Sequence, residues 1–379
     1  MKIVTIVGAR PQIIKAAALS REIKNHFSNE IEEFIVHTGQ HYDDNMSEVF
    51  FRELQIPKPA VNLGVGSSNH GEQTALMING IEQVLLEHKP DGIVVYGDTN
   101  STLAGAVAAA KIHIPVFHIE AGLRSFNKRM PEEINRIVAD HCSTLLFCPT
   151  RTAVKNLETE GFSSGLMGPF SLDKPGVFHC GDIMFDNSNY FSGLAEQQSQ
   201  ILQQQQLAGK AFVLATIHRN DNTDNRERLE IILEAIYRVS KKMEIAVILP
   251  LHPRTQKMMT EWNLASDLPE GVDVRIIPPV SFLDMIMLEK NCSLVLTDSG
   301  GVQKEAFFFG KPSLILRPET EWVEILEMRA ARLGGNTIDD IAGQAEALLN
   351  YPPTEFPPIF GDGHAAQFIC ETILKYNGR

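Results

Sequence analysis

Short apolar runs alternate with amphipathic stretches along most of this 379-residue chain, and the alternation restricts the folds it can adopt. Glycine or proline bounds the apolar runs, and the longer stretches between them carry apolar residues at helical spacing. Strands that alternate with helices predict βαβ units and a parallel sheet. The expected strands are 2–8, 32–39, 91–98, 115–122 and 143–150 in the first half, and 211–218, 244–253, 272–279, 293–301 and 313–318 in the second.

The alternation is interrupted once, between residues 163 and 187, where prolines and a glycine predict a connection. A Gln-rich run within residues 192–209 predicts an exposed helix or loop. We therefore expect an α/β protein of two Rossmann-like domains facing a central cleft. The expected domains are 1–170 and 171–362, followed by a helix at 363–379 that can pack back on the first domain. Because ligands of open α/β sheets bind beyond the carboxyl ends of the strands, the residues after each strand are the candidates for a site.

Composition excludes several classes of partner. The formal net charge of −13 disfavours nucleic acid, whose phosphates a negative protein repels, and no apolar run is long enough to span a membrane. The chain shows no HExxH or CxxC metal-ligand pattern, and we expect neither metal nor cofactor. The odd set of five cysteines predicts reduced thiols in a cytoplasmic compartment: Cys142, Cys148, Cys180, Cys292 and Cys370.

The stretch HIEAGLRSFNKRMPEEINR, residues 118–136, is dense in charge and runs from an expected strand into a helix. It carries Glu120, Arg124, Lys128, Arg129, Glu132, Glu133 and Arg136. Pro131 suits the first turn of the helix, and the acids beside it suit the positive end of the helix dipole. Spacing places Glu132, Asn135 and Arg136 on one face. The buried side is expected at Ile134, Ile137, Val138 and Leu145. A site that moves a proton and holds an anion is one interpretation; a capped, solvated helix start is the other.

Other strand ends of the first half add candidates. The turn Gly8-Ala9-Arg10-Pro11 opens a helix carrying Lys15, and such a turn presents free N–H groups that favour phosphate. A GxGxxG dinucleotide fingerprint is absent, and a simple tight turn with two surface bases is the alternative. Asp98 either caps the following helix or supplies a carboxylate to the site. Packing does not explain Glu120, directly after an apolar strand, and we favour a functional role for it.

Strand ends of the second half carry further polar residues. His218 and Arg219 follow one strand, His252 and Arg254 the next, and Arg317 the last. The Ser299-Gly300-Gly301 turn, followed by a helix with Glu305, is the most specific of these signals, because its glycines allow backbone to approach a phosphate closely. Glu305 can accept hydrogen bonds from ribose hydroxyls. Anion-binding turns in both halves and carboxylates in the first suggest a nucleotide diphosphate ligand whose attached group the carboxylates act on.

The motifs together resemble the non-hydrolysing UDP-N-acetylglucosamine 2-epimerases over nearly the whole chain. They occur in this order: GARPQIIKAA, TGQH, YGDTNST, HIEAGLRS, MPEEINR, ATIHRN, LPLHPRT, TDSGGVQKEA, LRPETE and FGDGHAA. Each is weak alone, but the ordered set is highly specific. The resemblance implies a glycosyltransferase-B fold, a cytoplasmic homodimer, a UDP-sugar substrate and a role in cell-surface polysaccharide biosynthesis.

The implied reaction inverts C2 of a UDP-amino sugar, taking UDP-N-acetylglucosamine to UDP-N-acetylmannosamine by elimination and re-addition of UDP. By position, Asp98, Glu120 and Glu132 match the catalytic carboxylates, His218 the catalytic histidine and Lys15 the active-site lysine. Arg10, Arg136, Ser299, Gly300, Gly301 and Glu305 match UDP-binding positions. To the substrate-binding set we add Arg124, Asn135, His252 and Arg317. Gln40, His41 and Gln73 lie near the position of an activator site found in some bacterial members.

Two segments depart from the members that act on UDP-N-acetylglucosamine. This chain has Ala9 and Gln12 where those members commonly read GTRPE, and Lys128-Arg129-Met130 where they commonly have an aromatic-containing SPW. The form here resembles the branch that acts on UDP-2,3-diacetamido-2,3-dideoxyglucuronate, whose sugar carboxylate Lys128 and Arg129 could pair with. That epimerase is the first alternative function. A glycosyltransferase of the same fold, a hydrolysing epimerase and a silent nucleotide-sugar sensor are the others.

Overall fold

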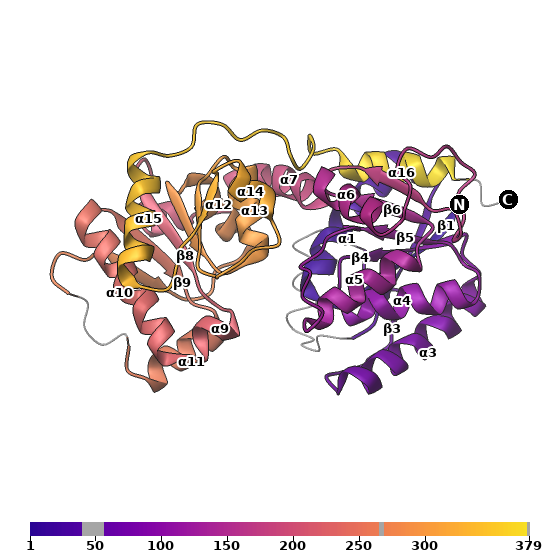
Figure 1. Cartoon of the computed structure of the whole chain (residues 1–379), viewed down its shortest axis with the longest axis horizontal. Helices are drawn as coiled ribbons and strands as arrows, with labels where there is room; N and C mark the ends of the chain where they lie inside the picture. Colours follow the sequence, from indigo (N-terminus) through magenta and orange to yellow (C-terminus); the bar gives the residue numbers. More distant parts are fainter. Residues whose placement is uncertain (40–56, 265–268, 377–379) are drawn as a thin grey trace. The chain divides into compact units, whose positions relative to one another are not determined.

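The computed structural model describes residues 1–39, 57–264 and 269–376. Contacts divide the chain into two compact units, each built around its own parallel sheet (Figure 1). The first unit comprises Met1–Asn187 and Pro358–Arg379, and the second comprises Ser188–Pro357. The expected α/β class with two wound sheets is therefore confirmed.

In the first unit, seven described strands pair in parallel in the order β3-β2-β1-β4-β5-β6-β7. The strands are β1 (Lys2–Val7), β2 (Glu32–His37), β3 (Val61–Asn62), β4 (Gly92–Tyr96), β5 (Val116–Ile119), β6 (Leu145–Cys148) and β7 (Gly176–His179). The helices are α1 (Arg10–Glu22), continued by the π-helix η1 (Ile23–Phe27), α3 (His70–His88), α4 (Asn100–Lys111), α5 (Pro131–His141), α6 (Arg151–Thr159) and α16 (Ala365–Lys375). The helix α7 (Ile183–Gln198) begins in the first unit and ends in the second.

In the second unit, six described strands pair in parallel in the order β10-β9-β8-β11-β12-β13. The strands are β8 (Phe212–Thr216), β9 (Ala246–Pro250), β10 (Val274–Ile277), β11 (Leu294–Thr297), β12 (Ser313–Ile315) and β13 (Ala331–Leu333). The helices are α8 (Ile201–Gln204), α9 (Asn220–Thr223), α10 (Arg226–Met243), α11 (Pro253–Glu261), α12 (Phe282–Asn291), α13 (Gly300–Phe308), α14 (Val323–Glu327) and α15 (Ile338–Asn350).

The units differ in their bounds from the expected domains. The stretch 163–187, expected as a connection, contains the strand β7, whose residues pair with β6 and so extend the first sheet. The first unit therefore continues to Asn187 instead of ending at residue 170. Its last helix, α16, packs against α1 (Figure 1, yellow). The Gln-rich run forms the end of α7 and the short helix α8, which anchors through the buried Ile201.

Strand order reverses at β1 and β4 in the first sheet, and at β8 and β11 in the second. These central strands are apolar on both faces, because helices cover both sides of a parallel sheet: the adjacent residues Ile3 and Val4 of β1, and Ile93 and Val94 of β4, are fully buried. The loops that leave such strands diverge to opposite sides and open a crevice at the point of reversal. Candidate residues after β4 and β11 therefore lie where a ligand is expected. Among the described residues, no helix is both long and apolar enough to cross a membrane.

Candidate active site

Asp98 follows β4 and forms an ion pair with α5. Arg136 Nη2 lies 2.5 Å from Asp98 Oδ2. The alternative that Asp98 caps α4 is wrong, because Thr99 is the N-cap and its hydroxyl accepts from the Thr102 amide. Burial raises the pKa of Asp98, although the positive charges of Arg136 and Lys15 lower it. A carboxylate with a raised pKa beside cationic groups is suited to proton exchange.

Lys15 and Glu120 form the second ion pair of this cluster. Lys15 comes from α1 and Glu120 follows β5, and their charged groups are in contact. Gly97 makes room for the pair, since a Cβ at Gly97 would lie 2.9 Å from Glu120 Oε2 and 3.1 Å from Lys15 Nζ. Gly97 also has φ +61°, a conformation that glycine adopts without strain. The ends of β4 and β5 and the helix α1 thus bring Asp98, Glu120 and Lys15 together.

Glu120 itself adopts a strained backbone conformation. Its φ is +69°, in the left-handed region that side chains rarely occupy. Such a conformation costs about 1–3 kcal/mol and persists where surrounding contacts enforce it, often at functional sites. Here the amides of Glu120 and Ala121 both donate to the Phe147 carbonyl, which fixes the turn. This backbone conformation directs the Glu120 carboxylate toward Lys15 and Gly97.

Glu133, which the sequence did not single out as a site residue, organises the start of α5. Its carboxylate accepts from the amide and hydroxyl of Ser125 and the amide of Phe126, and Arg136 Nη1 donates to it at 2.9 Å. Burial alone would raise the pKa of Glu133, but these hydrogen bonds lower it overall. Its neighbour Glu132 is exposed in the first turn. Glu132 still adds negative charge near Asp98, whose pKa it raises.

The buried face of α5 is not the one predicted. Ile134 is 41% exposed, and Ile137 and Val138 are only partly buried, whereas Leu145 belongs to the buried strand β6. The buried residues of the helix are Glu133, Asn135, Arg136, Ala139 and Asp140. Helical spacing predicted that the apolar face would be buried. The opposite, charged face is buried instead, because its side chains are paired in ion pairs. A helix that buries its charged side is consistent with a site at that side.

The turn Gly8-Ala9 differs from the expected anion-binding turn. Its two amides donate to Gln12 Oε1, at 2.9 Å and 3.2 Å, and so are not free for a phosphate. Gln12 Nε2 donates to the Tyr96 carbonyl and the Thr102 hydroxyl. Gln12 therefore ties the end of β1 to the end of β4. Arg10, at the start of α1, is exposed.

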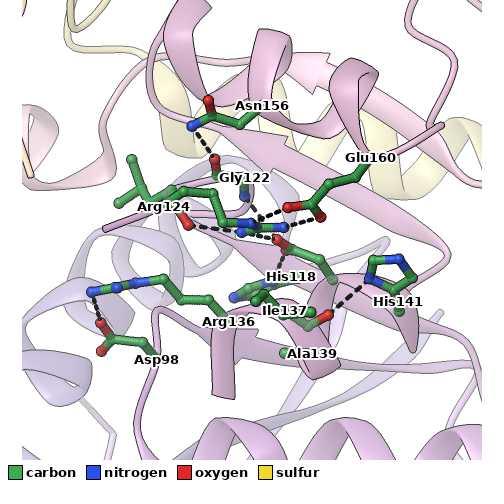
Figure 2. A network of polar contacts seen from close by, with 12 residues as sticks. Asp98, His118, Gly122, Arg124, Arg136, Ile137, Ala139, His141, Asn156 and Glu160 are labelled. Atoms are coloured by element: carbon green, nitrogen blue, oxygen red, sulfur yellow. Dashed lines mark hydrogen bonds and ion pairs between the residues drawn. The ribbon is translucent and has the colours of Figure 1, made fainter. Parts of the chain in front are cut away.

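Arg124 lies apart from this cluster, in a buried network beside it (Figure 2). Its guanidinium binds both oxygens of Glu160, at 2.6 Å and 2.7 Å, and also contacts Asp140 and the Leu123 carbonyl. With a side chain only 1% exposed, Arg124 is saturated by protein groups. The structure therefore gives it an internal role and does not bring it to the predicted substrate-binding set.

Asn135 binds the main chain of Asp98. Its side chain donates to the Asp98 carbonyl at 2.9 Å and to the side chain of Asn100. Asn100 in turn donates to Gln73, a residue near the expected activator site. Gln40 and His41, the other residues of that expectation, lie outside the described residues.

In the second unit, Asp298 accepts hydrogen bonds from several polar groups that follow β8. This fully buried carboxylate accepts from the amides of His218 and Arg219 and from the side chain of Asn222. The ring of His218 also faces it, with Nδ1 3.3 Å from Asp298 Oδ1, while the His218 side chain remains 39% exposed. Asp298 follows β11 directly and is not among the site residues predicted from the sequence. Its position between a strand and the Ser-Gly-Gly turn is the signal that could have identified it.

The Ser299-Gly300-Gly301 turn opens α13 as expected. Ser299 is the N-cap, and its hydroxyl accepts from the Val302 amide. A Cβ at Gly300 would lie 2.4 Å from Glu321 Oε1. Arg317 Nη1 donates to the other oxygen of Glu321 at 2.9 Å, and Arg317 lowers the pKa of this carboxyl, which burial alone would raise. The turn, Glu321 and Arg317 therefore form one local group.

The remaining candidates of the second unit lie on α11 and α13. His252 is the N-cap of α11, and its ring centroid is 5.8 Å from that of His218. Glu305 is partly buried on α13, where its charge, together with burial, raises the pKa of the fully buried Glu289. Within the described residues, no cluster of three or more histidine, cysteine or acidic side chains could hold a metal ion.

Comparison with known proteins identifies relatives along the whole chain. The family profile described as UDP-N-acetylglucosamine 2-epimerase matches residues 22–374. A protein of Methanococcus maripaludis named UDP-N-acetylglucosamine 2-epimerase homolog is 45% identical over 98% of this chain and 99% of its own length. The UDP-2,3-diacetamido-2,3-dideoxy-D-glucuronate 2-epimerase of Pseudomonas aeruginosa is 46% identical over 99% of this chain and all of its own.

A solved structure has the same fold throughout. The UDP-GlcNAc 2-epimerase of Methanocaldococcus jannaschii, in complex with UDP-GlcNAc and UDP, is 40% identical and superposes with a TM-score of 0.84. The match covers 99% of this chain and 100% of that one.

Replacing Arg136 by Met should raise the pKa of Asp98 further, because the guanidinium charge lowers it in the intact protein. Carbon-13 NMR of labelled aspartate reads the titration, and Arg238→Met, which removes an exposed arginine of the second unit, is the control. A carboxyl whose pKa is higher in the folded than in the unfolded state stabilises the fold at pH values below its unfolded-state pKa. This stabilisation is lost as the pH rises through its folded-state pKa. The variant should therefore lose this contribution over a wider pH range. An unchanged or lowered pKa of Asp98 would contradict the assigned pairing.

Proposed function

The chain belongs to the UDP-N-acetylglucosamine 2-epimerase family, and we propose that it inverts C2 of a UDP-amino sugar, converting UDP-N-acetylglucosamine into UDP-N-acetylmannosamine. The observation that carries this proposal is the pairing of two carboxylates, Asp98 and Glu120, with Arg136 and Lys15 at the strand-order reversal of the first sheet. The alternatives of sugar transfer and of nucleotide-sugar sensing do not require so many proton carriers.

The chemistry explains the need for carboxylates. The C2 hydrogen of the sugar is not acidic, since no carbonyl is adjacent to it. Departure of UDP with the C1–O bond electrons leaves positive charge at C1, which acidifies the C2 hydrogen. A carboxylate then takes this proton, and the C2–H electron pair forms the C1–C2 double bond of a 2-acetamidoglucal. A carboxylic acid delivers a proton to the opposite face of C2, and UDP returns to C1.

The proposed roles divide between the two units. Asp98, Glu120 and Glu132 carry protons and stabilise positive charge at the sugar, and Lys15 positions Glu120 through their ion pair. His218 assists at the departing UDP. The remaining proposed residues bind UDP, with Glu305 on the ribose: Arg10, Arg136, Asn135, His252, Ser299, Gly300, Gly301, Glu305 and Arg317. The Ser299-Gly300-Gly301 turn supports this assignment, because it opens α13 and the N-terminus of a helix favours an anion.

A second candidate substrate is the diacetamido uronate named for the Pseudomonas aeruginosa relative. Lys128 and Arg129 support it, since both are exposed on the loop between β5 and α5. Glu133 fixes the middle of this loop through Ser125 and Phe126, so the bases are presented from an anchored segment. A sugar carboxylate is the group that two such cations can pair with.

We propose in addition that the protein acts in the cytoplasm, as a homodimer, in the synthesis of cell-surface polysaccharide. The five free cysteines support a reducing compartment, and the other two parts of this proposal follow from the resemblance alone. Sedimentation equilibrium should give twice the 42.1 kDa chain mass. A monomer mass at all concentrations would exclude the dimer.

Incubation in heavy water should distinguish the candidate functions and substrates. With the correct sugar, NMR should show a manno-configured UDP-sugar that carries deuterium at C2, because the proton is exchanged on the enzyme. UDP-N-acetylglucosamine and the diacetamido uronate are compared in parallel, and the faster one is the substrate. Free UDP with free sugar would indicate a hydrolysing enzyme. Absence of exchange with both sugars would refute the proposed epimerisation.

Glu120→Gln should abolish turnover while UDP still binds, because the amide keeps the size of the side chain but neither accepts nor delivers the proton. Calorimetric titration with UDP gives the binding, and the exchange assay gives the turnover. Glu160→Gln, at the outer end of the Arg124 network, is the matched control. Turnover of Glu120→Gln at the rate of the control would remove Glu120 from the mechanism.

A further inference from the structure

A buried aspartate, Asp140, connects three segments of the first unit. It lies on α5 and is fully buried. Its Oδ1 is 2.7 Å from Nδ1 of His118 on β5. Its Oδ2 is 2.7 Å from Arg124 Nη1 and accepts from the Gly122 amide at 3.2 Å. Asp140 therefore links the helix α5 to the strand and to the turn that flank Glu120.

The hydrogen bonds of His118 determine its protonation. The ring is fully buried, and its second nitrogen, Nε2, lies 2.8 Å from the Gly97 carbonyl oxygen. A carbonyl oxygen only accepts, so Nε2 donates. Asp140 Oδ2 lies against the Arg124 guanidinium and accepts from the Gly122 amide, so Asp140 is a carboxylate and also only accepts. Both ring nitrogens must then donate, and only the doubly protonated imidazolium does so.

The charges of this network balance. The cations are His118 and Arg124, and the anions are Asp140 and Glu160, which binds the outer side of Arg124 (Figure 2). Cys148, the nearby thiol, stays neutral because burial and the Asp140 charge raise its pKa. Buried charges that are paired and fully hydrogen-bonded avoid most of the cost of desolvation. The imidazolium is thus stable inside the unit.

Both ends of the network reach the proposed proton carriers. Gly97, whose carbonyl His118 holds, immediately precedes Asp98, and Gly122, whose amide Asp140 holds, lies two residues after Glu120. The amide of Gly97 donates to the Ile119 carbonyl, which joins the two strand ends directly. We propose that His118 and Asp140 are positioning residues of the epimerase, in which a buried imidazolium–carboxylate pair sets Asp98 and Glu120 relative to each other. This inference rests on the proposed function for its catalytic consequence.

The decisive comparison is Asp140→Asn against Glu160→Gln. Each substitution removes one carboxylate charge from Arg124, so both weaken the same network. Only Asp140→Asn also removes an acceptor from His118 or from the Gly122 amide, because the asparagine side chain has a single acceptor oxygen. We expect kcat to fall about 10²-fold in Asp140→Asn, as for a small misplacement of reacting groups, with KM little changed. Glu160→Gln should keep the kcat of the unmodified protein. Equal kcat values for the two variants would overturn the inference.

Substitutions of His118 add a graded test. His118→Gln keeps an N–H donor for the Gly97 carbonyl, whereas His118→Leu removes it at similar volume. We expect His118→Gln to retain more kcat than His118→Leu, with both KM values near that of the unmodified protein. Equal losses in the two folded variants would contradict a positioning role, since a purely structural role does not depend on that donor.

A measurement on the unmodified protein covers the case in which the variants fail to fold. Nitrogen-15 NMR, with His118 assigned by its loss in His118→Gln or by through-bond correlation, should show a proton on each ring nitrogen. A neutral ring would overturn the inference. The deuterium-exchange assay on the same sample tests the proposed function separately. Absence of exchange with a doubly protonated ring would refute the function alone, whereas exchange with a neutral ring would refute the inference alone.

Discussion

The ion pair between Arg136 and Asp98 is the contact on which the arrangement of the first unit's strand ends depends. It joins the buried side of α5 to the loop after β4, and Glu133 holds the same arginine from the other side. Because Glu133 also binds the backbone of residues 125 and 126, the loop that leads into α5 is fixed by the same group. A charge at the centre of these contacts cannot be lost without leaving others buried and unpaired.

The second unit uses a similar arrangement with different residues. A buried aspartate, Asp298, accepts from backbone amides after β8 and faces a histidine ring, as Asp140 does in the first unit. The two differ in the second contact of the histidine. His118 is fully buried and held at both nitrogens, whereas the His218 side chain is more than a third exposed. A buried histidine with two fixed bonds suits support, and an exposed one held on one side suits contact with a ligand.

Much of the fold and the positions of the candidate residues could be predicted from the sequence. Each expected strand is present, because buried parallel strands are continuous apolar runs with clear ends. The strands β3, β7 and β13 were not predicted, since each lies at a sheet edge and includes an exposed residue, so none forms a continuous buried apolar run. The family, too, was correctly identified from the ordered motifs.

The errors concern side-chain partners. Gln12 was read only as a departure from related sequences, but it occupies the amides of the turn that was expected to bind phosphate. Arg124 was placed with the substrate, but Glu160, 36 residues later in the chain, saturates it. Glu132 and Glu133 are adjacent residues of the same type, and only the tertiary structure shows that the first is exposed and the second is buried. Local spacing does not reveal which distant group a charge meets.

The chain passes between the two units twice, after Asn187 and before Pro358, and this has a consequence for its synthesis. The second unit is contiguous, so all of its residues leave the ribosome before the segment that contains α16. The first unit, by contrast, needs α16 against α1, which is made more than three hundred residues earlier. Units that fold as they emerge would therefore finish in the reverse of their order along the chain. The surface of α1 that α16 covers therefore stays exposed until the segment that contains α16 has been made.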